Sequence, residues 1–578
     1  MDIQPDSEIY QEQYDGSRQT SLSAPPSVSP GARSNLNLEP AVQALNSDKQ
    51  QHLLTAWNAT QYHYAAIPLL HTLFEQQVAE IPDALAVISE ERALTYAALN
   101  GSAAHLAGLL QDAGVGPEIL VAVYLERSFE MVNALLAILK AGGAYVPLDP
   151  ATPPERLAFI FRDCAPSVVI TQSHIKDRLP AEYRGRILVL DDLSLKSESS
   201  SAPLCWQGNP LQAANLLYTS GSTGQPKGVI NTHQGLHNRL FWMQDRYHLK
   251  RTDRVLQKTP YSFDVSLWEI LWPFQVGATL VLARPDGHRD STYLAQLLNE
   301  QSITVAHFVP SMLQIFLDEP GLTRCATLRY VFCSGEVLSA ELQQRCFERL
   351  DAELHNLYGP TEAAIDVTAW ACKRGSMAST VPIGSPIYNT QIILLDQHGT
   401  LVPQGTSGEL YIGGMGLARG YHQRPDLTAE CFRPHPGSPD PGARLYKTGD
   451  LARERPDHNF EYIGRLDHQV KLRGQRIELG EIEIALARHP GVRSCLVQVQ
   501  TFAANDQRLV AYLIPESGLK PATKELLRFL RLSLPAYMIP SVFMYLEAWP
   551  LLSNGKIHRR ALPAATGTRT ISTHMDQP

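Results

Sequence analysis

Residues 218–228 read YTSGSTGQPKG, a stretch in which Gly, Ser and Thr crowd together before a single lysine, Lys227. Glycines let backbone N–H groups approach anionic oxygens without a Cβ in the way, and the hydroxyls and the ammonium add further donors. The composition therefore predicts a loop that grips phosphate. It is not a Walker A loop, because Gly228 follows the lysine where that motif needs Ser or Thr, and no G-x-G-x-x-G is present here. Taken alone, the stretch could also be a mobile Gly/Ser surface loop.

Strand and helix signals alternate on both sides of this stretch. Residues 119–125, ILVAVYL, suit a buried strand, and Ser128 can cap a following helix whose apolar residues recur at three-to-four spacing up to Gly142 and Gly143. Further apolar strand candidates are AYVPL, SVVIT, ILVLD, RVLQ, ATLVLA, ITVAHFV and LRYVFCSG, with helical stretches between several of them. The pattern predicts an α/β fold with largely parallel sheets.

The pattern of secondary-structure signals changes twice toward the C-terminus. From about Ile383 the sequence is β-rich, and after Asp467 a smaller segment follows with helix candidates at 480–488 and 524–532. Residues 1–46 are rich in Ser, Pro, Gln and Asn and read as a flexible arm or linker. We therefore expect four parts, which are the arm 1–46, a large core 47–466, a small mobile domain 467–563 and a flexible tail 564–578.

Composition narrows the function classes. The 578 residues hold 50 Lys plus Arg against 58 Asp plus Glu, which argues against a general nucleic-acid or anionic-membrane binder. The 8 cysteines show no C-x-x-C spacing, so a disulfide framework or zinc site is not expected. Without a secretory signal or an apolar run long enough to cross a bilayer, the expectation is a cytoplasmic enzyme.

Ten motifs in order carry a resemblance to a known family. They are LTYAALN (94–100), LKAGGAYVPLDP (139–150), LLYTSGSTGQPKGV (216–229), FDVSLWE (263–269), NLYGPTE (356–362), GELYIGGMGLARGY (408–421), YKTGDLAR (446–453), GRLDHQVKLRGQRIELGEIE (464–483), LPAYMIP (534–540) and NGKIHR (554–559). The chain, from about Leu53 to Leu562, resembles the adenylate-forming superfamily, and within it the amino-acid adenylation domains of nonribosomal peptide synthetases. The resemblance implies the acyl-CoA synthetase/luciferase-like fold, with stacked α/β sheets and a β-rich subdomain in the large domain and an α+β small domain.

The implied reaction has two halves. A carboxylate attacks the α-phosphate of ATP and releases pyrophosphate, and a carrier's phosphopantetheine thiol then displaces AMP. Positioning and charge neutralisation carry most of such catalysis. The residues that the resemblance assigns to the β- and γ-phosphates are Thr219, Ser220, Gly221, Ser222, Thr223, Gly224 and Lys227. Glu362 would hold Mg²⁺, which prefers oxygen ligands and shared phosphate oxygens, and Thr361 would lie near the α-phosphate.

The remaining roles also come from the resemblance. The adenosine site would comprise Asp450 on the ribose hydroxyls, Arg465 near the ribose or phosphate, Tyr358 stacked on adenine, and Asn356, Gly335 and Tyr462 lining the pocket, Tyr462 being equally open to a strand-packing role. Lys556 would be the catalytic lysine that bridges the substrate carboxylate and the α-phosphate. Lys471 lies on the face of the small domain that turns inward for thioester formation, and Asp467 would be the hinge.

The pocket motifs indicate which acid is activated. Asp264 matches the acid that binds the α-ammonium of an amino acid, although an Asp there could also cap a helix or turn. The full set of matched positions is Asp264, Val265, Trp268, His307, Phe332, Ser334, Leu357, Ile365, Asp366 and Lys556, and it closely resembles the pattern for L-serine. Large apolar side chains would shorten the pocket, and His307, Ser334 and Asp366 offer hydrogen-bond partners to a small hydroxyl, unless His307 and Asp366 form a satisfied core pair.

Two rival functions stay open at this stage. One is another adenylate-forming enzyme such as an acyl- or aryl-CoA ligase, against which Asp264 and the polar pocket speak. The other is an inactive adenylation-like binding module. The small domain is not followed by an L-G-G-x-S-type carrier segment, so we expect a peptidyl carrier protein in trans, for a chain that is either free-standing or cut from a larger synthetase making an antibiotic or siderophore. Some relatives also need an MbtH-like partner, and no motif here decides that point.

Overall fold

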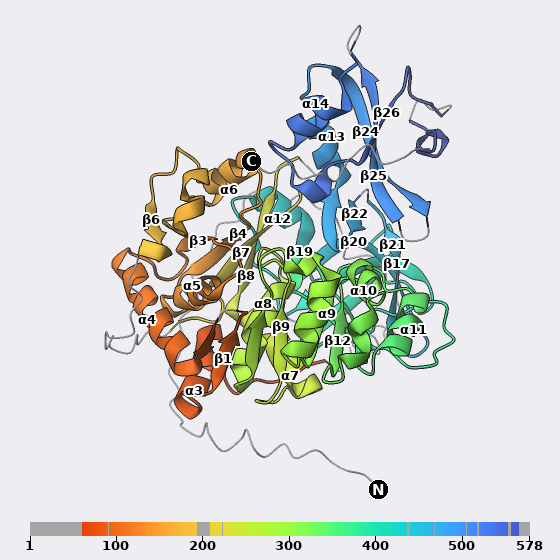
Figure 1. Cartoon of the computed structure of the whole chain (residues 1–578). Coiled ribbons are helices and arrows are strands. Elements are labelled where there is room, and N and C mark those ends of the chain that lie inside the picture. Colours follow the sequence, from red (N-terminus) through yellow and green to blue (C-terminus); the bar gives the residue numbers. More distant parts are fainter. Residues whose placement is uncertain are drawn as a thin grey trace.

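The computed structural model describes residues 60–565 apart from residue 91 and the segments 193–207, 222–223, 436–437, 439, 468, 504–505, 517–519 and 553–556. The predicted arm, most of the predicted tail, and the predicted site residues Ser222, Thr223 and Lys556 lie outside the described residues. The described chain forms a mixed α/β fold with a large N-terminal and a small C-terminal domain, as the sequence predicts. Figure 1 shows the small domain, in blue, on one side of the large one.

One sheet of the large domain carries the predicted phosphate-binding stretch. Its strand order is β18-β8-β7-β4-β3-β5-β6. The strands are β3 (Leu120–Tyr124), β4 (Ala144–Leu148), β5 (Val168–Thr171), β6 (Arg186–Val189), β7 (Ala213–Thr219), β8 (Lys227–Thr232) and β18 (Gly420–Tyr421). Pairs among β3 to β7 are parallel, as expected, whereas β7–β8 and β8–β18 are antiparallel.

A second sheet carries three of the predicted pocket residues, His307, Phe332 and Leu357. Its strand order is β15-β14-β13-β12-β11-β9-β10-β1-β2. The strands are β1 (Leu85–Ile88), β2 (Ala93–Thr95), β9 (Arg254–Gln257), β10 (Thr279–Leu282), β11 (Val305–Phe308), β12 (Tyr330–Cys333), β13 (Glu353–Tyr358), β14 (Thr368–Ala371) and β15 (Ser385–Pro386). The run from β1 to β13 is parallel, and both edges are antiparallel.

Helices cover these sheets. They are α3 (Leu70–Glu80), α4 (Tyr96–Asp112), α5 (Phe129–Lys140), α6 (Pro154–Cys164), α7 (His233–Tyr247), α8 (Val265–Val276), α9 (Ser291–Glu300), α10 (Pro310–Phe316), α11 (Ala340–Arg349) and α12 (Pro425–Cys431). The predicted cap on α5 is confirmed, because the Ser128 hydroxyl accepts from the Met131 N–H at 3.3 Å. A continuous core that includes Phe74, Trp268 and Phe332 joins helices and strands of both sheets.

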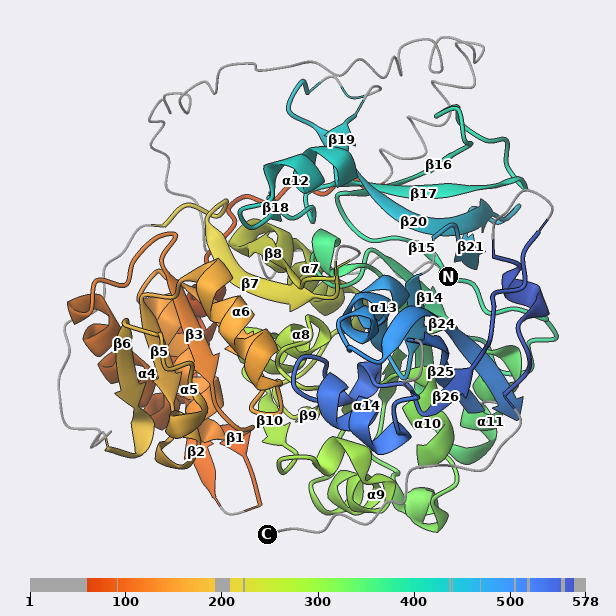
Figure 2. The same cartoon turned by 90° about the horizontal axis from the view of Figure 1, so that it is seen from above.

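The β-rich segment forms a third sheet, with β16 (Thr390–Leu395), β17 (Ser407–Gly414), β19 (Phe432–Pro434), β20 (Arg444–Glu454) and β21 (Phe460–Arg465). The small domain contains β22 (Gln469–Leu472), β23 (Gln475–Glu478), α13 (Leu479–Ala487), β24 (Val492–Ala503), β25 (Asp506–Pro515), α14 (Thr523–Leu530) and β26 (Val542–Tyr545). The predicted helices 480–488 and 524–532 are thus confirmed to within two residues. In Figure 2, α13 and α14 lie over the large domain.

Candidate active site

The predicted phosphate loop is the tip of a β-hairpin. Thr219 at the end of β7 pairs with Lys227 at the start of β8, so the Gly- and Ser-rich residues lie between two hydrogen-bonded strands. Gly221 is needed for sterics, since a Cβ there would lie 1.9 Å from the Gln225 carbonyl oxygen. Gly224 has φ +80°, in the left-handed region that glycine favours. The hairpin therefore holds a tight turn that side chains would block.

The small domain touches this hairpin directly. The Ser220 hydroxyl donates to the Arg476 carbonyl at 2.8 Å, and the Gly221 N–H donates to the Glu481 carboxylate at 3.2 Å. Glu481 in turn pairs with Arg156 of α6 at 2.5 Å, with both side chains buried. A loop N–H that can bind an anion is thus engaged by a carboxylate of α13.

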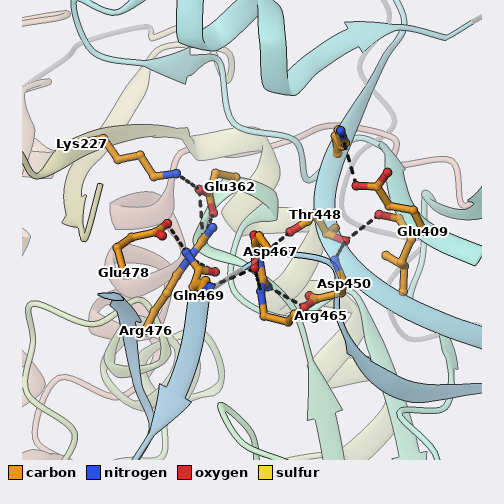
Figure 3. Close-up of polar contacts among 12 residues, drawn as sticks. Lys227, Glu362, Glu409, Thr448, Asp450, Arg465, Asp467, Gln469, Arg476 and Glu478 are labelled. Atoms are coloured by element: carbon orange, nitrogen blue, oxygen red, sulfur yellow. Dashed lines mark hydrogen bonds and ion pairs between the residues drawn. The ribbon is translucent and has the colours of Figure 1, made fainter. Parts of the chain in front are cut away.

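Glu362 is the centre of a buried charge cluster (Figure 3). It lies in a short 3₁₀ turn, Thr361–Ala363, and its side chain is 0% exposed. Its carboxylate accepts from Arg476 at 2.8 and 3.1 Å and from the Tyr421 hydroxyl at 2.8 Å, and Lys227 lies 3.5 Å away. Burial alone would raise the pKa of Glu362, but Arg476 and Lys227 outweigh burial and hold that pKa far below its usual range. The Glu362 carboxylate is therefore ionised, and its oxygens can act as ligands of a cation.

A second cluster gathers the residues predicted for adenosine. The Tyr358 hydroxyl donates to Asp450 at 2.6 Å, and Arg465 pairs with the same carboxylate at 2.5 Å. Arg465 also pairs with Asp467 at 2.7 Å (Figure 3). The Lys471 ammonium lies 5.4 Å from the centre of the Tyr358 ring. The face of the small domain that carries Lys471 is thus turned toward this cluster.

Three predicted lining residues sit differently around that cluster. The Tyr462 ring lies 6.5 Å from that of Tyr358. The Asn356 amide donates to the Pro382 carbonyl at 2.8 Å, so it braces the backbone beside β13. Gly335 has φ +84°, and a Cβ there would come within 3.7 Å of Gly474 in the small-domain hairpin.

Residues predicted for the amino-acid pocket come together where β11, β12 and α8 meet. His307 and Phe332 are register partners on adjacent parallel strands, and the His307 Nε2 and Ser334 Oγ atoms are hydrogen-bonded at 2.9 Å. The Trp268 ring packs edge-on against Phe332 at 5.4 Å and His307 at 6.0 Å. The His307 Nδ1 and Trp268 Nε1 atoms are buried and make no hydrogen bond within the described part of the chain.

Asp264 occupies the N-terminal end of α8. One carboxylate oxygen accepts from the Val265 N–H at 2.8 Å, so the capping role considered from sequence is present. The other accepts from the Thr361 hydroxyl at 2.6 Å and links this pocket to the Glu362 turn. Burial, with the nearby Asp366 and Glu362 carboxylates, raises the pKa of Asp264 to about 6.

A strained loop positions Asp366. Ala364 and Ile365 have positive φ angles of +55° and +87°. A positive φ is rare for a β-branched residue such as Ile365. A Cβ on Gly359 would lie 2.2 Å from the Ile365 carbonyl, so the two ends of the loop are in close contact. The loop places Asp366 2.8 Å from Arg239 of α7. The predicted alternative of a His307–Asp366 core pair is wrong, because each residue has a different partner.

Several residues at these sites were missed from sequence. They are Arg239, Tyr421, Arg476 and Glu481. Arg239 had a readable signal, because it lies next to the buried stripe Leu236, Leu240, Met243 on α7, where a charge needs a partner. The other three fall inside matched motifs, but their pairing depends on how the domains meet.

Comparison with known proteins gives the family. The AMP-binding enzyme family matches residues 74–422, and the AMP-binding enzyme C-terminal domain matches residues 481–556. The chain therefore belongs to the AMP-binding enzyme family. Within that family it is an adenylation domain of the nonribosomal peptide synthetase type, an AMP-forming amino-acid adenylating ligase.

Three relatives illustrate the match. Phosphinothricin tripeptide synthetase PhsB of Streptomyces viridochromogenes is 48% identical over 89% of this chain and 44% of its own length. A four-domain nonribosomal peptide synthetase solved with AMP and glycine matches at 34% identity, with TM-score 0.66, over 89% of this chain and 37% of its own. An adenylation and PCP protein solved with a vinylsulfonamide inhibitor matches at 28% identity, with TM-score 0.74, over 86% and 84%. The chain thus spans less than half of PhsB and of the four-domain synthetase.

The described residues lack two features. No helix there is long and apolar enough to cross a membrane. Within the same residues no group of three His, Cys, Asp or Glu side chains could hold a metal ion.

Proposed function

We propose that this domain activates L-serine as seryl-adenylate with ATP and then transfers it to the phosphopantetheine thiol of a peptidyl carrier protein. The product would serve a nonribosomal peptide or siderophore pathway. The observation that carries the serine assignment is the set of buried polar atoms around Trp268, His307 and Ser334. We place the serine side chain at these atoms and its α-ammonium at Asp264.

The phosphate end supports the use of ATP. The Gly221 N–H and the Lys227 ammonium are donors for the β- and γ-phosphates, together with the hydroxyl of Thr219. Glu362 fits a magnesium ion, because its carboxylate is buried and ionised. When bound, Mg²⁺ would neutralise phosphate charge. Arg476 holds the same oxygens in this arrangement, so it must leave first.

The adenosine cluster supports an adenylate. Asp450 would accept from the ribose hydroxyls, and Arg465 holds that carboxylate in its orientation. Tyr358 would stack on adenine while its hydroxyl stays on Asp450. In the first half-reaction the serine carboxylate oxygen bonds to the α-phosphorus, and the bond to the pyrophosphate oxygen breaks. Lys556 would offset the charge that develops there.

The pocket supports an amino acid with a short polar side chain. Asp264 would pair with the α-ammonium, and the Thr361 bond fixes the orientation of the carboxylate. Apolar surface in this pocket would come from Val265, Leu357 and Ile365. The rings of Trp268 and Phe332 would limit the depth of the pocket and so the length of the substrate side chain. His307 Nδ1, which makes no hydrogen bond within the described residues, can form one with the serine hydroxyl.

The second half-reaction follows from the small domain. The thiol sulfur would attack the acyl carbonyl carbon, and AMP would leave with the bonding electrons. Lys471 faces the adenosine cluster and would neutralise the AMP phosphate, and Asp467 would be the hinge. A peptidyl carrier protein would present the thiol. The need for an MbtH-like protein and the cytoplasmic location remain predictions.

The proposal is tested by serine-dependent exchange of labelled pyrophosphate into ATP. Serine should exceed alanine, threonine and glycine, and the proposal fails if it is no faster than these three. Turnover with coenzyme A in place of a loaded carrier would instead support the acyl-CoA ligase alternative. We expect little coenzyme A turnover, because the Asp264 carboxylate is suited to pair with the α-ammonium of an amino acid.

A further inference from the structure

Arg239 and Asp366 form an ion pair in the core beside the amino-acid pocket. Their side chains are 1% and 2% exposed, and the Arg239 Nη2 to Asp366 Oδ2 distance is 2.8 Å. Arg239 comes from α7 and Asp366 from the strained loop after Glu362. Burying two charges is costly, so such pairs are often replaceable by apolar residues without loss of stability. A role in function would explain why charges occupy this position.

The pair leaves much of the guanidinium unused. The Nε and Nη1 atoms of Arg239 are buried and have no hydrogen-bond partner within the described residues. The guanidinium also lies 5.0 Å from the Trp242 ring, on its own helix. A buried ion pair that serves only as a brace usually has its remaining donors satisfied. The unused donors instead point to a site that holds charge next to a ligand.

Arg239 sets the electrostatic balance of the pocket. Asp366 contributes to the raised pKa of Asp264, so the two carboxylates are close enough to interact. Burial first, and then the cations Lys258 and Arg239, hold the pKa of His307 well below its usual value, which keeps the ring neutral. Arg239 compensates Asp366, whereas Asp264, the other carboxylate of the predicted pocket set, forms no ion pair within the described residues. The pocket therefore offers a carboxylate partner to the α-ammonium of an amino acid, but not to a second ammonium on its side chain.

We propose that Arg239 is a specificity-determining positioning residue that makes the pocket reject amino acids with a cationic side chain. It acts through Asp366, whose carboxylate it holds and whose charge it cancels. A side-chain ammonium would meet the guanidinium at close range, whereas a hydroxyl can donate to Asp366 without a charge penalty. This inference rests on the proposed amino-acid activation and names a determinant outside the matched pocket positions.

The test uses isosteric substrates. L-2,3-diaminopropionate has the shape of serine with an ammonium in place of the hydroxyl. We would measure pyrophosphate exchange with both amino acids for wild type, Arg239→Gln, Arg239→Lys and the matched control Arg246→Gln, an exposed arginine on the same helix. The ratio of kcat/KM for serine to that for diaminopropionate should fall about 10- to 100-fold in Arg239→Gln, the range of one charge-assisted contact. It should stay near wild type in the other two.

A purely structural role predicts a different result. Arg239→Gln would then slow both substrates equally, and an unchanged ratio overturns the proposal. If Arg239→Gln does not fold because Asp366 is left unpaired, the double variant Arg239→Gln/Asp366→Asn carries no lone charge. The double variant removes the guanidinium that a side-chain ammonium would meet, but it also removes the carboxylate that would attract that ammonium. Its ratio should therefore move toward diaminopropionate by less than in Arg239→Gln, and a wild-type ratio in the double variant likewise contradicts the proposal.

The outcomes separate this inference from the serine assignment. If wild type prefers another uncharged amino acid, the serine assignment fails, and the ratio is read between that amino acid and its cationic isostere. If wild type prefers a cationic amino acid, the Arg239 proposal is itself refuted. If no amino acid supports exchange, both proposals fail.

Discussion

The Arg476 guanidinium of the small domain lies 2.8 Å from the Glu362 carboxylate of the large domain (Figure 3). Glu362 is also the residue that we propose for Mg²⁺. Its oxygens are held on three sides by Arg476, Tyr421 and Lys227. A magnesium ion at Glu362 would compete with this ion pair for the same oxygens, and we therefore infer that the domain arrangement seen here serves the stage after pyrophosphate has left.

This competition predicts that Arg476→Gln separates the two half-reactions. Pyrophosphate exchange should persist, since Glu362 stays available for Mg²⁺, whereas transfer to the carrier should slow by about 10- to 100-fold for the loss of one charge-assisted contact. Single-turnover transfer of radiolabelled serine to a carrier measures the second step. Arg473→Gln, at an exposed position of the same hairpin, is the control. Equal losses in both steps would contradict the assignment.

Lys556 and Lys471 should each affect a different half-reaction. Lys556→Ala should abolish most exchange, because its ammonium is proposed to offset charge on the α-phosphate. Lys471→Ala should leave exchange within a few-fold of wild type and impair transfer, because Lys471 faces the adenosine cluster only when the hairpin β22–β23 is turned inward. Exchange unaffected by Lys556→Ala would favour the reading of an inactive binding module.

Substrate binding should depend on pH through Asp264. Burial and nearby carboxylates raise the pKa of Asp264 to about 6, and only the ionised form pairs with the α-ammonium. As pH falls through about 6 the carboxylate protonates, so kcat/KM for serine should drop, by up to about tenfold per pH unit. Stability runs the other way, since a raised carboxyl pKa favours the folded state below about pH 4 and that gain is lost as pH rises through 6. A kcat/KM that is flat between pH 5 and 7 would contradict this role.

The hydroxyl-binding group can be tested at His307. His307→Ala removes a neutral ring hydrogen-bonded to Ser334, so the preference for serine over alanine should fall by about 10-fold or more. Exchange with each amino acid over a concentration series gives the two kcat/KM values. Ser291→Ala, remote on α9, serves as a control, and a preference unchanged by His307→Ala would exclude the ring from the pocket.

The fold, with its large and small domains, could be predicted from the sequence because it depends on local pattern and matched motifs, and the same motifs predict which site residues lie together. Ser128 caps its helix, and Tyr358, Asp450 and Arg465 meet because three motifs end at one place. The pairing of Arg239 with Asp366 was not predictable, because it joins a helix to a strained loop 127 residues away. The same holds for Arg476, whose contact with Glu362 depends on how the small domain is turned.

Amino-acid-dependent pyrophosphate exchange across the twenty standard amino acids, with and without an MbtH-like protein, tests the central claim most directly. The account predicts that serine gives the highest rate, exceeds alanine by up to about 10⁴-fold, and exceeds threonine by about 10- to 200-fold, since only a methyl group separates those two. Asp264→Asn should remove the serine signal. A different amino acid at the top of the profile, or a serine rate equal to that of alanine, threonine or glycine, would contradict the serine assignment.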